Sequence, residues 1–259
     1  MDKIALQKAV EKEIKGAQAK ISLYIKNLKT GEVLFRYKED LQVVSASIIK
    51  VLIMVTALEE IQKGALSKDT LISVTESTIL EDSEVFEYGK REYTLDEILV
   101  WMIINSDNTA TNCLIDLLTM DKINQTCKKL NLKSTKLERK MLDFNAVKIG
   151  FNNYTSAMDM CELYKSLYDQ SILSEELCDY AVSILLRQRD KQNSMRYIPD
   201  DIKAAHKTGG LDFLNHDAGI FYLGESDYYF GAFVWEAPDD VYGRKWIGRV
   251  SKMVYEYYK

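Results

Sequence analysis

The stretch Ser45-Ala46-Ser47-Ile48-Ile49-Lys50 opens the most apolar segment of the chain, which continues almost unbroken to Ile61. Serine is a favourable N-cap, as at Ser45, and Gly64 is a natural C-terminal stop, so the pattern predicts a helix over about 47–63. A helix that is apolar on all sides is expected to be buried. We therefore expect the fold to be organised around this helix, with Ser47 in its first turn at the solvent end.

Ser47 and Lys50 lie three residues apart, which places both side chains on one face of the predicted helix. A serine hydroxyl is a weak nucleophile at neutral pH, and a partly buried lysine with a lowered pKa can serve as its base. The N–H groups at the helix N-terminus could also stabilise a developing oxyanion. Ser-x-x-Lys is a short pattern that also occurs by chance, so its meaning depends on the rest of the chain.

The composition is that of an ordinary globular protein of 259 residues, with a net charge of -5 and only 2 prolines and 12 glycines. The negative charge argues against a nucleic-acid partner. No window of about 18 residues is both apolar and uncharged, so no membrane segment is expected. Residues 1–20 form an amphipathic pattern rather than a signal peptide, which favours a cytoplasmic protein, or a secreted or cell-envelope protein whose leader has been removed.

The cysteines are Cys113, Cys127, Cys161 and Cys178, and none of them forms a C-x-x-C pair. All four fall in segments with helical patterns, so buried free thiols are expected. The two histidines do not have the spacing of metal ligands. The sequence therefore implies neither a metal ion nor an organic cofactor.

The predicted elements change character along the chain. A Thr94-Leu95-Asp96-Glu97 capping box predicts a helix through Ile104, and 134–153 is expected to be a long irregular loop of functional importance. The other predicted helices cover residues 1–18, 109–118, 121–130, 156–169, 174–188 and 241–258, and the predicted strands cover 20–28, 33–37, 202–208, 218–223 and 228–235.

These elements predict an α/β fold in which a mainly antiparallel five-stranded sheet is flanked by the terminal helices and joined to an all-helical part. We expect one domain over 1–259, with an α/β part at about 1–45 and 200–259. The helical part would then cover about 46–199. The candidate site would lie between the two parts, at the start of the central helix.

Two further short motifs complete an ordered set with Ser47-x-x-Lys50. Ser106-Asp107-Asn108 follows a predicted helix, and Lys207-Thr208-Gly209 ends a predicted strand; Ser47 and Ser106 are 59 residues apart, and Ser106 and Lys207 are 101 apart. In order and spacing this set resembles the class A β-lactamases and the related penicillin-binding proteins. The resemblance spans nearly the whole chain and implies a β-lactamase-like three-layer fold.

The resemblance implies a catalytic role for Ser47, Lys50, Ser106 and Lys207. Ser47 would attack the amide carbonyl and become acylated, and Lys50 would hold or accept its proton. Ser106 would relay a proton to the leaving nitrogen, aided by the charge of Lys207. Asp107 is expected to be structural.

The same resemblance implies substrate-binding roles for the remaining motif residues. Asn108 would hydrogen-bond the substrate's side-chain amide, and Thr208, next to Gly209, would bind its carboxylate. The backbone N–H groups of Ser47 and Gly210 would form the oxyanion hole. Because the Ser-Lys pair already supplies a base, His206 and His216 are expected to be structural or pocket-wall residues.

The long loop departs from the class A pattern. That pattern has an Arg, then a Glu two residues later and an Asn four residues beyond, and the Glu and Asn hold the hydrolytic water. Arg139 and Asn145 match it, but the Glu position is Met141, and methionine cannot act as a general base. Asp143 is a weaker candidate for replacing the missing carboxylate.

A second departure comes after the Lys207-Thr208-Gly209 strand. Many class A enzymes place an Arg on the next strand to hold the substrate carboxylate, whereas this chain has His216-Asp217-Ala218-Gly219 there. Both departures are expected to affect how substrate is bound and released.

The leading hypothesis is a serine β-lactamase-like hydrolase that opens a β-lactam amide through acyl-Ser47 and deacylates slowly. One alternative is a D-alanyl peptidase or penicillin-binding protein acting on cell-wall peptides. Another is a sensor domain that is acylated once, and a third is a relative with an intact fold but no β-lactam reactivity. The expected partner is thus a small-molecule β-lactam or a cell-wall peptide, and the oligomeric state is not predicted.

Overall fold

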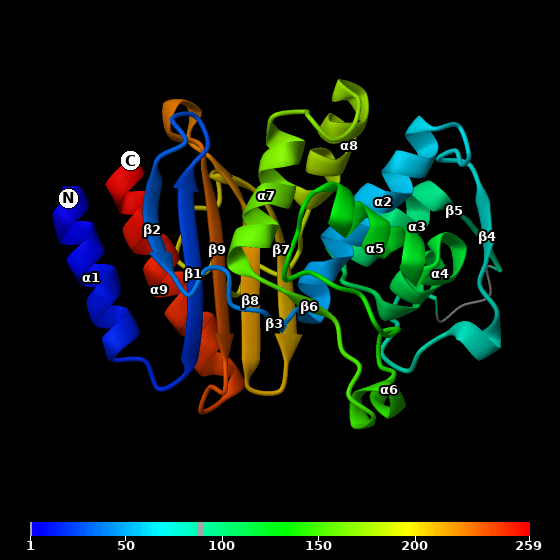
Figure 1. Cartoon of the computed structure of the whole chain (residues 1–259), viewed down its shortest axis with the longest axis horizontal. Helices are drawn as coiled ribbons and strands as arrows, with labels where there is room; N and C mark the ends of the chain where they lie inside the picture. The colour runs from blue at the N-terminus through cyan, green and yellow to red at the C-terminus, as the bar shows by residue number, and fades with distance from the viewer. Residues whose placement is uncertain (1, 87–90) are drawn as a thin grey trace.

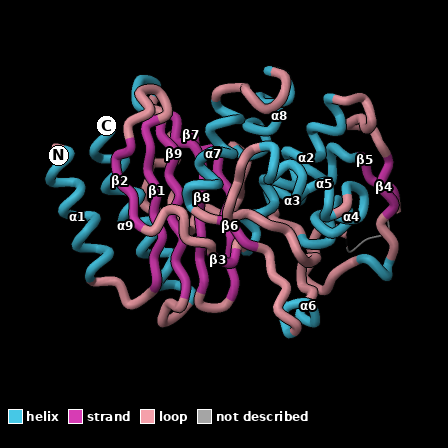
Figure 2. Tube along the Cα trace, in the orientation of Figure 1, coloured by secondary structure: helices cyan, strands magenta, loops and turns pink. Residues whose placement is uncertain are grey.

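The computed structural model describes residues 2–86 and 91–259, and its centre is one antiparallel five-stranded sheet (Figures 1 and 2). The strands lie in the order β2-β1-β9-β8-β7. Their bounds are β1 Lys20–Asn27, β2 Val33–Tyr37, β7 Lys203–Leu211, β8 Leu214–Tyr222 and β9 Tyr228–Trp235. Because β1 pairs with β9 from Lys20↔Trp235 to Asn27↔Tyr228, the two ends of the chain share one sheet. The predicted fold class is confirmed.

The two terminal helices cover one face of this sheet, at the left of Figure 1. They are α1 Lys3–Lys15 and α9 Asp240–Tyr258. Leu6 and Val10 of α1 and Trp246 of α9 are buried in a hydrophobic cluster with the sheet, which we call the outer core. The Trp246 indole donates a hydrogen bond to the Glu13 carbonyl at 3.1 Å, so its polar atom is satisfied while its ring is buried.

The helical elements lie on the other face of the sheet. The helix α7 packs directly on β1, β8 and β9, and α2 lies deeper among the helices. Their buried side chains and those of the sheet face form a second cluster, which we call the inner core. The bounds of these helices are α2 Lys50–Gln62, α3 Leu95–Ile104, α4 Asn108–Leu118, α5 Met120–Lys129, α7 Ala157–Tyr168 and α8 Glu175–Leu185.

The central helix begins differently from the prediction. Its first turn is the 3₁₀ helix η1, Ala46–Ile49, and the α-helical part α2 starts only at Lys50. Ser45 does not cap it: its backbone is in the helical region and its hydroxyl bonds the Ala46 carbonyl instead. The end of the helix is as predicted, because Gly64 adopts a φ of 74° that favours glycine.

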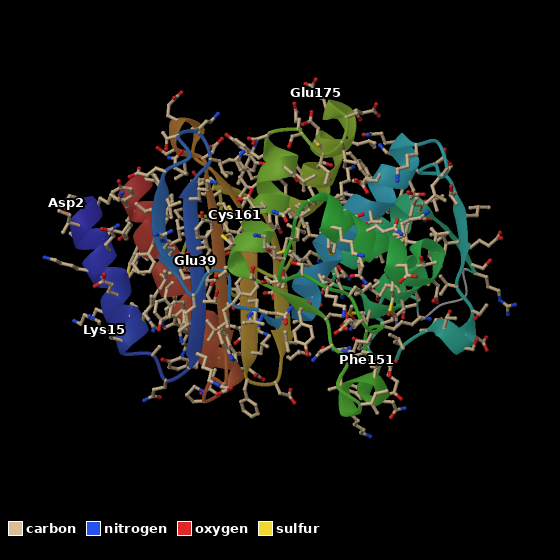
Figure 3. All side chains as sticks on the ribbon, viewed as in Figure 1. Asp2, Lys15, Glu39, Phe151, Cys161 and Glu175 are labelled. Atoms are coloured by element: carbon tan, nitrogen blue, oxygen red, sulfur yellow. The ribbon has the colours of Figure 1, made fainter. Side chains whose placement is uncertain are left out.

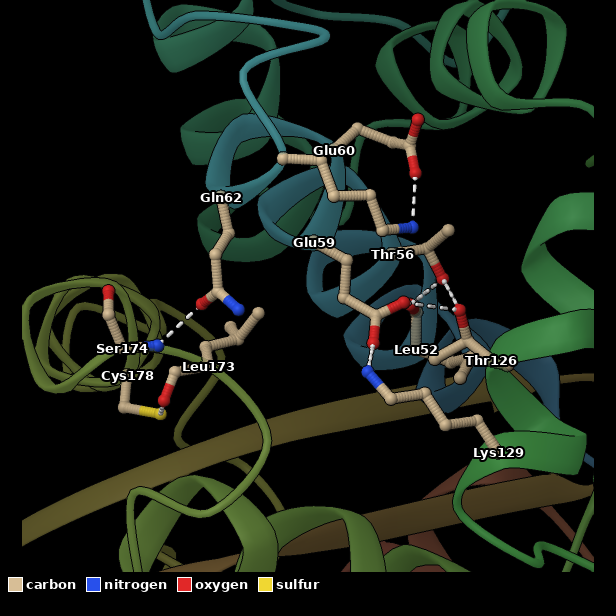
Figure 4. A network of polar contacts seen from close by, with 11 residues as sticks. Leu52, Thr56, Glu59, Glu60, Gln62, Thr126, Lys129, Leu173, Ser174 and Cys178 are labelled. Carbon is tan, nitrogen blue, oxygen red and sulfur yellow. Dashed lines mark hydrogen bonds and ion pairs between the residues drawn. The ribbon is translucent and has the colours of Figure 1, made fainter.

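A polar network anchors the far end of α2 to α5 (Figure 4). The buried Glu59 carboxylate accepts a hydrogen bond from Thr126 at 3.0 Å and pairs with Lys129. Thr56 donates to the Leu52 carbonyl and lies 3.0 Å from the Thr126 hydroxyl. Polar groups therefore enter this apolar helix only where partners compensate their desolvation.

Several shorter elements lie around these layers, and most of them were not predicted. The described residues form two small antiparallel ladders, and the loop over 134–153 contains a helix and is joined to Tyr154 by an isolated bridge at Lys136. The predicted capping box at Thr94 and Glu97 is present. The short elements are β3 Val43–Val44, β4 Leu71–Ser73, η2 Glu76–Thr78, β5 Glu92–Thr94, α6 Phe144–Lys148, β6 Tyr154–Thr155 and η3 Gly224–Ser226.

All four cysteines are free thiols, as predicted. Cys127, Cys161 and Cys178 are buried and Cys113 is half-buried. Figure 3 shows Cys161 within the body of the molecule, on α7. Burial raises the pKa of the Cys127 thiol to about 12, so this group is neutral and unreactive at ordinary pH. Within the described residues, no helix combines the length and the hydrophobicity needed to cross a membrane.

Candidate active site

The three sequence motifs meet where the start of the central helix faces the edge strand β7. Lys50 Nζ donates to the Ser106 carbonyl at 2.5 Å and to Asn108 Oδ1 at 2.8 Å, and it lies 3.2 Å from the Ser106 hydroxyl. The Lys207 ammonium lies 3.1 Å from the same Ser106 hydroxyl and donates to the Thr208 carbonyl at 2.7 Å. The Ser106 hydroxyl therefore lies within hydrogen-bond reach of two amines.

Both lysines are fully buried, and their electrostatics differ from those of surface lysines. Burial, followed by the nearby charge of Lys207, holds the pKa of Lys50 well below its usual range. Burial lowers the pKa of Lys207 to about 8. Two ammonium groups this close repel each other, which favours the state in which one of them is neutral. A neutral Lys50 amine can accept a proton while Lys207 remains a cation.

Ser47 is half-buried on η1 and borders a cavity of about 210 Å³. Within the described part of the chain its hydroxyl has no hydrogen-bond partner, and Lys50 bonds Ser106 and Asn108 instead. Ser47 and Lys50 are thus brought to one place without contact between their reactive atoms. The cavity is lined by Ala46, Ser47, Asp82, Asn108, Arg139, Met141, Leu142, Phe144, Asn153, Gly210 and Leu211.

Three residues of the candidate site have strained backbone conformations, and two of them, Ala46 and Leu142, line this cavity. Ala46, Ser106 and Leu142 have φ values of 45°, 57° and 58°, in the left-handed region that non-glycine residues rarely adopt. Such residues cost about 1–3 kcal/mol each and persist where packing fixes them. A Cβ atom on Gly209 would lie 3.1 Å from Ile48 Cγ1 and 3.2 Å from Ala46 Cβ, so this glycine allows β7 to approach η1 closely.

A second cavity, of about 440 Å³, is lined by Ser106, which does not line the first. Ser106 and Thr208 line it, together with the exposed Arg189. The Arg189 guanidinium donates to Asn105 Oδ1 at 3.0 Å. A cation thus lines the same cavity as Thr208, together with Glu84 and Asp190, although none is found on the strand after the Lys207-Thr208-Gly209 motif. Arg189 was missed because it belongs to an irregular segment after α8 that carries no motif.

The long loop places Met141 in the first cavity, where its side chain is 8% exposed. The Asn112 side chain fixes this position by accepting from the Met141 N–H at 2.7 Å and donating to the Met141 carbonyl at 3.2 Å. Asn145, matched to the family pattern by spacing, is exposed on α6 and does not line the cavity. Asp143 caps α6 through the Ala146 N–H at 2.9 Å and is absent from the cavity lining, so the expectation that it could replace the carboxylate gains no support.

Asp107 has the structural surroundings expected of it. Its carboxylate caps α4 by accepting from the Ala110 N–H at 2.7 Å, and it also accepts from the Ser83 hydroxyl at 2.7 Å. Burial raises the pKa of this carboxyl group. The cap fixes the turn that presents Ser106 and Asn108.

Neither histidine lies at the Ser47 cavity. His206 Nδ1 is 2.9 Å from Asp217 Oδ1, and Asp217 also accepts from Ser194, so this group is a separate buried network behind β7. His216 Nε2 is 2.9 Å from the Val44 carbonyl, and burial lowers the pKa of this histidine to about 4, so it is neutral at ordinary pH. In the part of the chain that the structure describes, no cluster of three or more His, Cys, Asp or Glu side chains could hold a metal ion.

A serine at a helix start close to two buried lysines, with both histidines bound elsewhere, is the arrangement expected of a class A β-lactamase-like serine hydrolase. The chain belongs to the beta-lactamase enzyme family, because the model of that family matches residues 5–258. The resemblance expected from the three motifs is therefore confirmed.

Two sequence relatives illustrate the range of this family. A beta-lactamase of Bacteroides uniformis is 24% identical over 272 residues, which cover 97% of this chain and 90% of the relative. The D-alanyl-D-alanine carboxypeptidase DacF of Bacillus subtilis (strain 168) is 25% identical over 158 residues, which cover 58% of this chain and 37% of that protein.

Solved structures confirm the fold. A beta-lactamase from Sphaerobacter thermophilus has a TM-score of 0.89 at 23% identity and covers 100% of this chain and 98% of its own. A mutant of the protein PBP-A, solved as an acyl-enzyme complex with penicillin G, has a TM-score of 0.88 at 26% identity and covers 98% of this chain and 96% of its own.

Proposed function

We propose that this protein opens the amide bond of a β-lactam through an acyl-Ser47 intermediate. The observation that carries the proposal is the position of the Ser106 hydroxyl between the Lys50 and Lys207 amines, at 3.2 and 3.1 Å. Once Lys50 has taken the proton of the attacking hydroxyl, such a chain of groups can pass a proton through Ser106 to the leaving nitrogen.

The proton transfers of the proposed acylation balance. Ser47 Oγ attacks the carbonyl carbon, and the neutral Lys50 amine takes its proton. As the carbon–nitrogen bond breaks, Ser106 gives its proton to the leaving nitrogen and is reprotonated by Lys50. The N–H groups of Ser47 and Gly210, two residues that border one cavity, are the proposed donors to the oxyanion.

Cationic and hydroxyl groups are available for the substrate carboxylate. Thr208 and Arg189 line the cavity that also contains Ser106, and the Lys207 ammonium contacts Ser106. Arginine suits a planar carboxylate because it can donate two parallel hydrogen bonds. We assign Arg189 the anchoring role that many class A enzymes give to an arginine on the next strand.

Hydrolysis of the acyl-enzyme is expected to be slow. Met141 borders the Ser47 cavity at the position where the family pattern has a glutamate. A thioether cannot take a proton from water, and loss of a general base commonly costs about 10²–10⁴-fold in rate. Acylation is expected to outpace deacylation for this reason.

A D-alanyl peptidase is the alternative enzyme, supported by the likeness to the carboxypeptidase of Bacillus subtilis. A sensor that is acylated once is the alternative without turnover, and the PBP-A acyl-enzyme with penicillin G supports a stable adduct in a related fold. All three proposals share the acyl-Ser47 step and differ in the second step and in the natural substrate.

The test monitors the colour released from a chromogenic cephalosporin by the wild type and by Ser47→Ala. The proposal predicts a burst of about one equivalent per protein followed by a slow steady rate, and neither phase in Ser47→Ala. A burst with no steady rate favours the sensor. Absence of both phases in the wild type contradicts the proposal and directs the search to peptides and esters.

A further inference from the structure

The cavity beside Ser47 contains a carboxylate that none of the three motifs includes. Asp82 lines this cavity, and its Oδ2 accepts a hydrogen bond from Asn108 Nδ2 at 2.6 Å. The other end of the same amide, Asn108 Oδ1, accepts from Lys50 Nζ at 2.8 Å. Asn108 therefore links the buried lysine to an exposed carboxylate at the cavity mouth.

Among the described residues, no lysine, arginine or histidine forms an ion pair with this Asp82 carboxylate. Arg139 borders the same cavity, but its Nε donates to Asn152 at 2.9 Å and its NH1 donates to the Lys140 carbonyl at 3.0 Å. The Arg139 side chain thus holds the loop together and leaves Asp82 available to a ligand.

Four large apolar side chains share the cavity lining with Asp82. Met141, Leu142, Phe144 and Leu211 border the cavity, and Phe144 and Leu211 are 61% and 41% exposed. Exposed apolar side chains beside a pocket are typical of a surface that contacts a ligand. The cavity therefore combines the negative charge of Asp82 with an apolar or aromatic contact surface.

Asp82 also competes for the donor proposed to hold the substrate. One Asn108 N–H already donates to Asp82. A neutral acyl side chain must therefore compete with Asp82 for a hydrogen bond from this amide. A substrate with an ammonium group can instead bind the carboxylate directly. The attraction between the ammonium and the carboxylate then compensates the free-energy cost of removing water from both groups.

We propose that Asp82 is a specificity-determining residue that favours substrates carrying an ammonium group close to the reacting amide, next to an apolar or aromatic group. The inference rests on the proposed acylation of Ser47. It assigns the substrate class by chemistry: β-lactams or peptides whose acyl side chain bears a free amine.

The test compares ampicillin with benzylpenicillin, which share the bicyclic nucleus and the phenyl ring and differ in the ammonium group of ampicillin. Second-order rate constants for acylation are measured for both compounds at neutral pH, by intact-protein mass spectrometry. An exposed carboxylate–ammonium pair predicts that Asp82→Asn lowers the ampicillin-to-benzylpenicillin ratio about fivefold. Asp82→Lys is expected to lower the ratio further.

Glu81→Gln is the matched control, because Glu81 is an exposed neighbour that borders neither cavity. It removes the same charge from the same loop and is expected to leave the ratio unchanged. Retained acylation by benzylpenicillin shows that each variant is folded. An equal ratio in the wild type and Asp82→Asn overturns the role of Asp82, whereas no acylation by either penicillin overturns the proposed function itself.

Discussion

At the scale of single residues, the proposed chemistry requires that two buried lysines, Lys50 and Lys207, hold different charges. Burial and the charge of Lys207 lower the pKa of Lys50, and burial lowers the pKa of Lys207 to about 8. The proposed base, Lys50, works only when neutral. The proposed electrostatic partner, Lys207, works only when protonated. We therefore expect the same physical cause, desolvation, to set both limits of the working pH range.

We predict a bell-shaped pH dependence for the acylation rate constant with benzylpenicillin. The rate rises with pH as Lys50 loses its proton, and it falls above about 8 as Lys207 loses its own. Lys207→Arg keeps a positive charge at alkaline pH and is expected to move the falling limb upward. A falling limb at the same pH in Lys207→Arg would show that another group causes it.

Arg189 gives a second prediction at this scale. Arg189→Ala is expected to lower the second-order acylation rate constant about fivefold, because an exposed cation near the substrate carboxylate contributes up to about 1 kcal/mol. Arg187→Ala is the control, since Arg187 is exposed on the same segment but borders neither cavity. Equal effects of the two substitutions would argue against a carboxylate contact at Arg189.

The sequence predicted the site residues that belong to the three motifs, but not the residues that approach the site from other segments. Ser47, Ser106 and Lys207 were found because residue order and spacing are visible in the sequence. Asp82 and Arg189 were not found, since each approaches the site from a segment without periodicity or motif. Their positions depend on tertiary packing, which short patterns do not report. The catalytic roles assigned to the motif residues stay predictions.

At the scale of elements, the loop over 134–153 is expected to determine how long the acyl-enzyme persists. Spacing alone matched Asn145 to the water-holding position, but that residue lies on α6 with its side chain exposed. The short helix could not be anticipated, because its Asp143 cap was interpreted as a possible catalytic carboxylate. The Asp143 carboxylate accepts from the Ala146 N–H as the cap of α6 and does not line the Ser47 cavity.

We predict that Met141→Glu accelerates deacylation, because Met141 borders the same cavity as Ser47 and is held in place through Asn112. The expected gain is on the order of 10²-fold, the lower end for a restored general base. The rate is measured by the loss of the penicillin adduct from the intact protein. Met141→Gln has a similar shape without a base, so equal rates in the Gln and Glu variants would refute the explanation.

The elements were predicted closely where hydrophobic periodicity is strong. Strand 33–37 and strand 228–235 have the predicted bounds, and Thr94 caps α3 as expected. The prediction failed for the 3₁₀ turn at Ala46–Ile49 and for the two-residue ladder between β3 and β6. Such short elements are fixed by contacts distant in sequence, here the close approach of β7 to η1.

At the scale of the whole molecule, one sheet lies between two hydrophobic cores. The outer core packs α1 and α9 on one face, and the inner core packs α7 and the central helix on the other. Because the strand that bears Lys207 and Thr208 belongs to this sheet, the site depends on both cores. We expect the two cores to unfold together.

We predict that Trp246→Ala destabilises the whole protein by about 3–5 kcal/mol, although Trp246 lies in the outer core, away from the site. Urea unfolding is monitored by circular dichroism and by loss of penicillin labelling, and both signals are expected to shift together. Val241→Ala, at a 48% exposed position on the same helix, is expected to change stability by less than about 0.5 kcal/mol. Labelling that survives loss of the outer core would indicate that the two cores fold independently.

The central claim is that Ser47 is acylated quickly and deacylated slowly. The most direct measurement is intact-protein mass spectrometry over time after mixing with benzylpenicillin, with peptide mapping of the adduct and Ser47→Ala as control. The account predicts an adduct of one whole penicillin on Ser47 that persists after free drug is removed, and none in the variant. An adduct that survives in Ser47→Ala, or no adduct in the wild type, would contradict it.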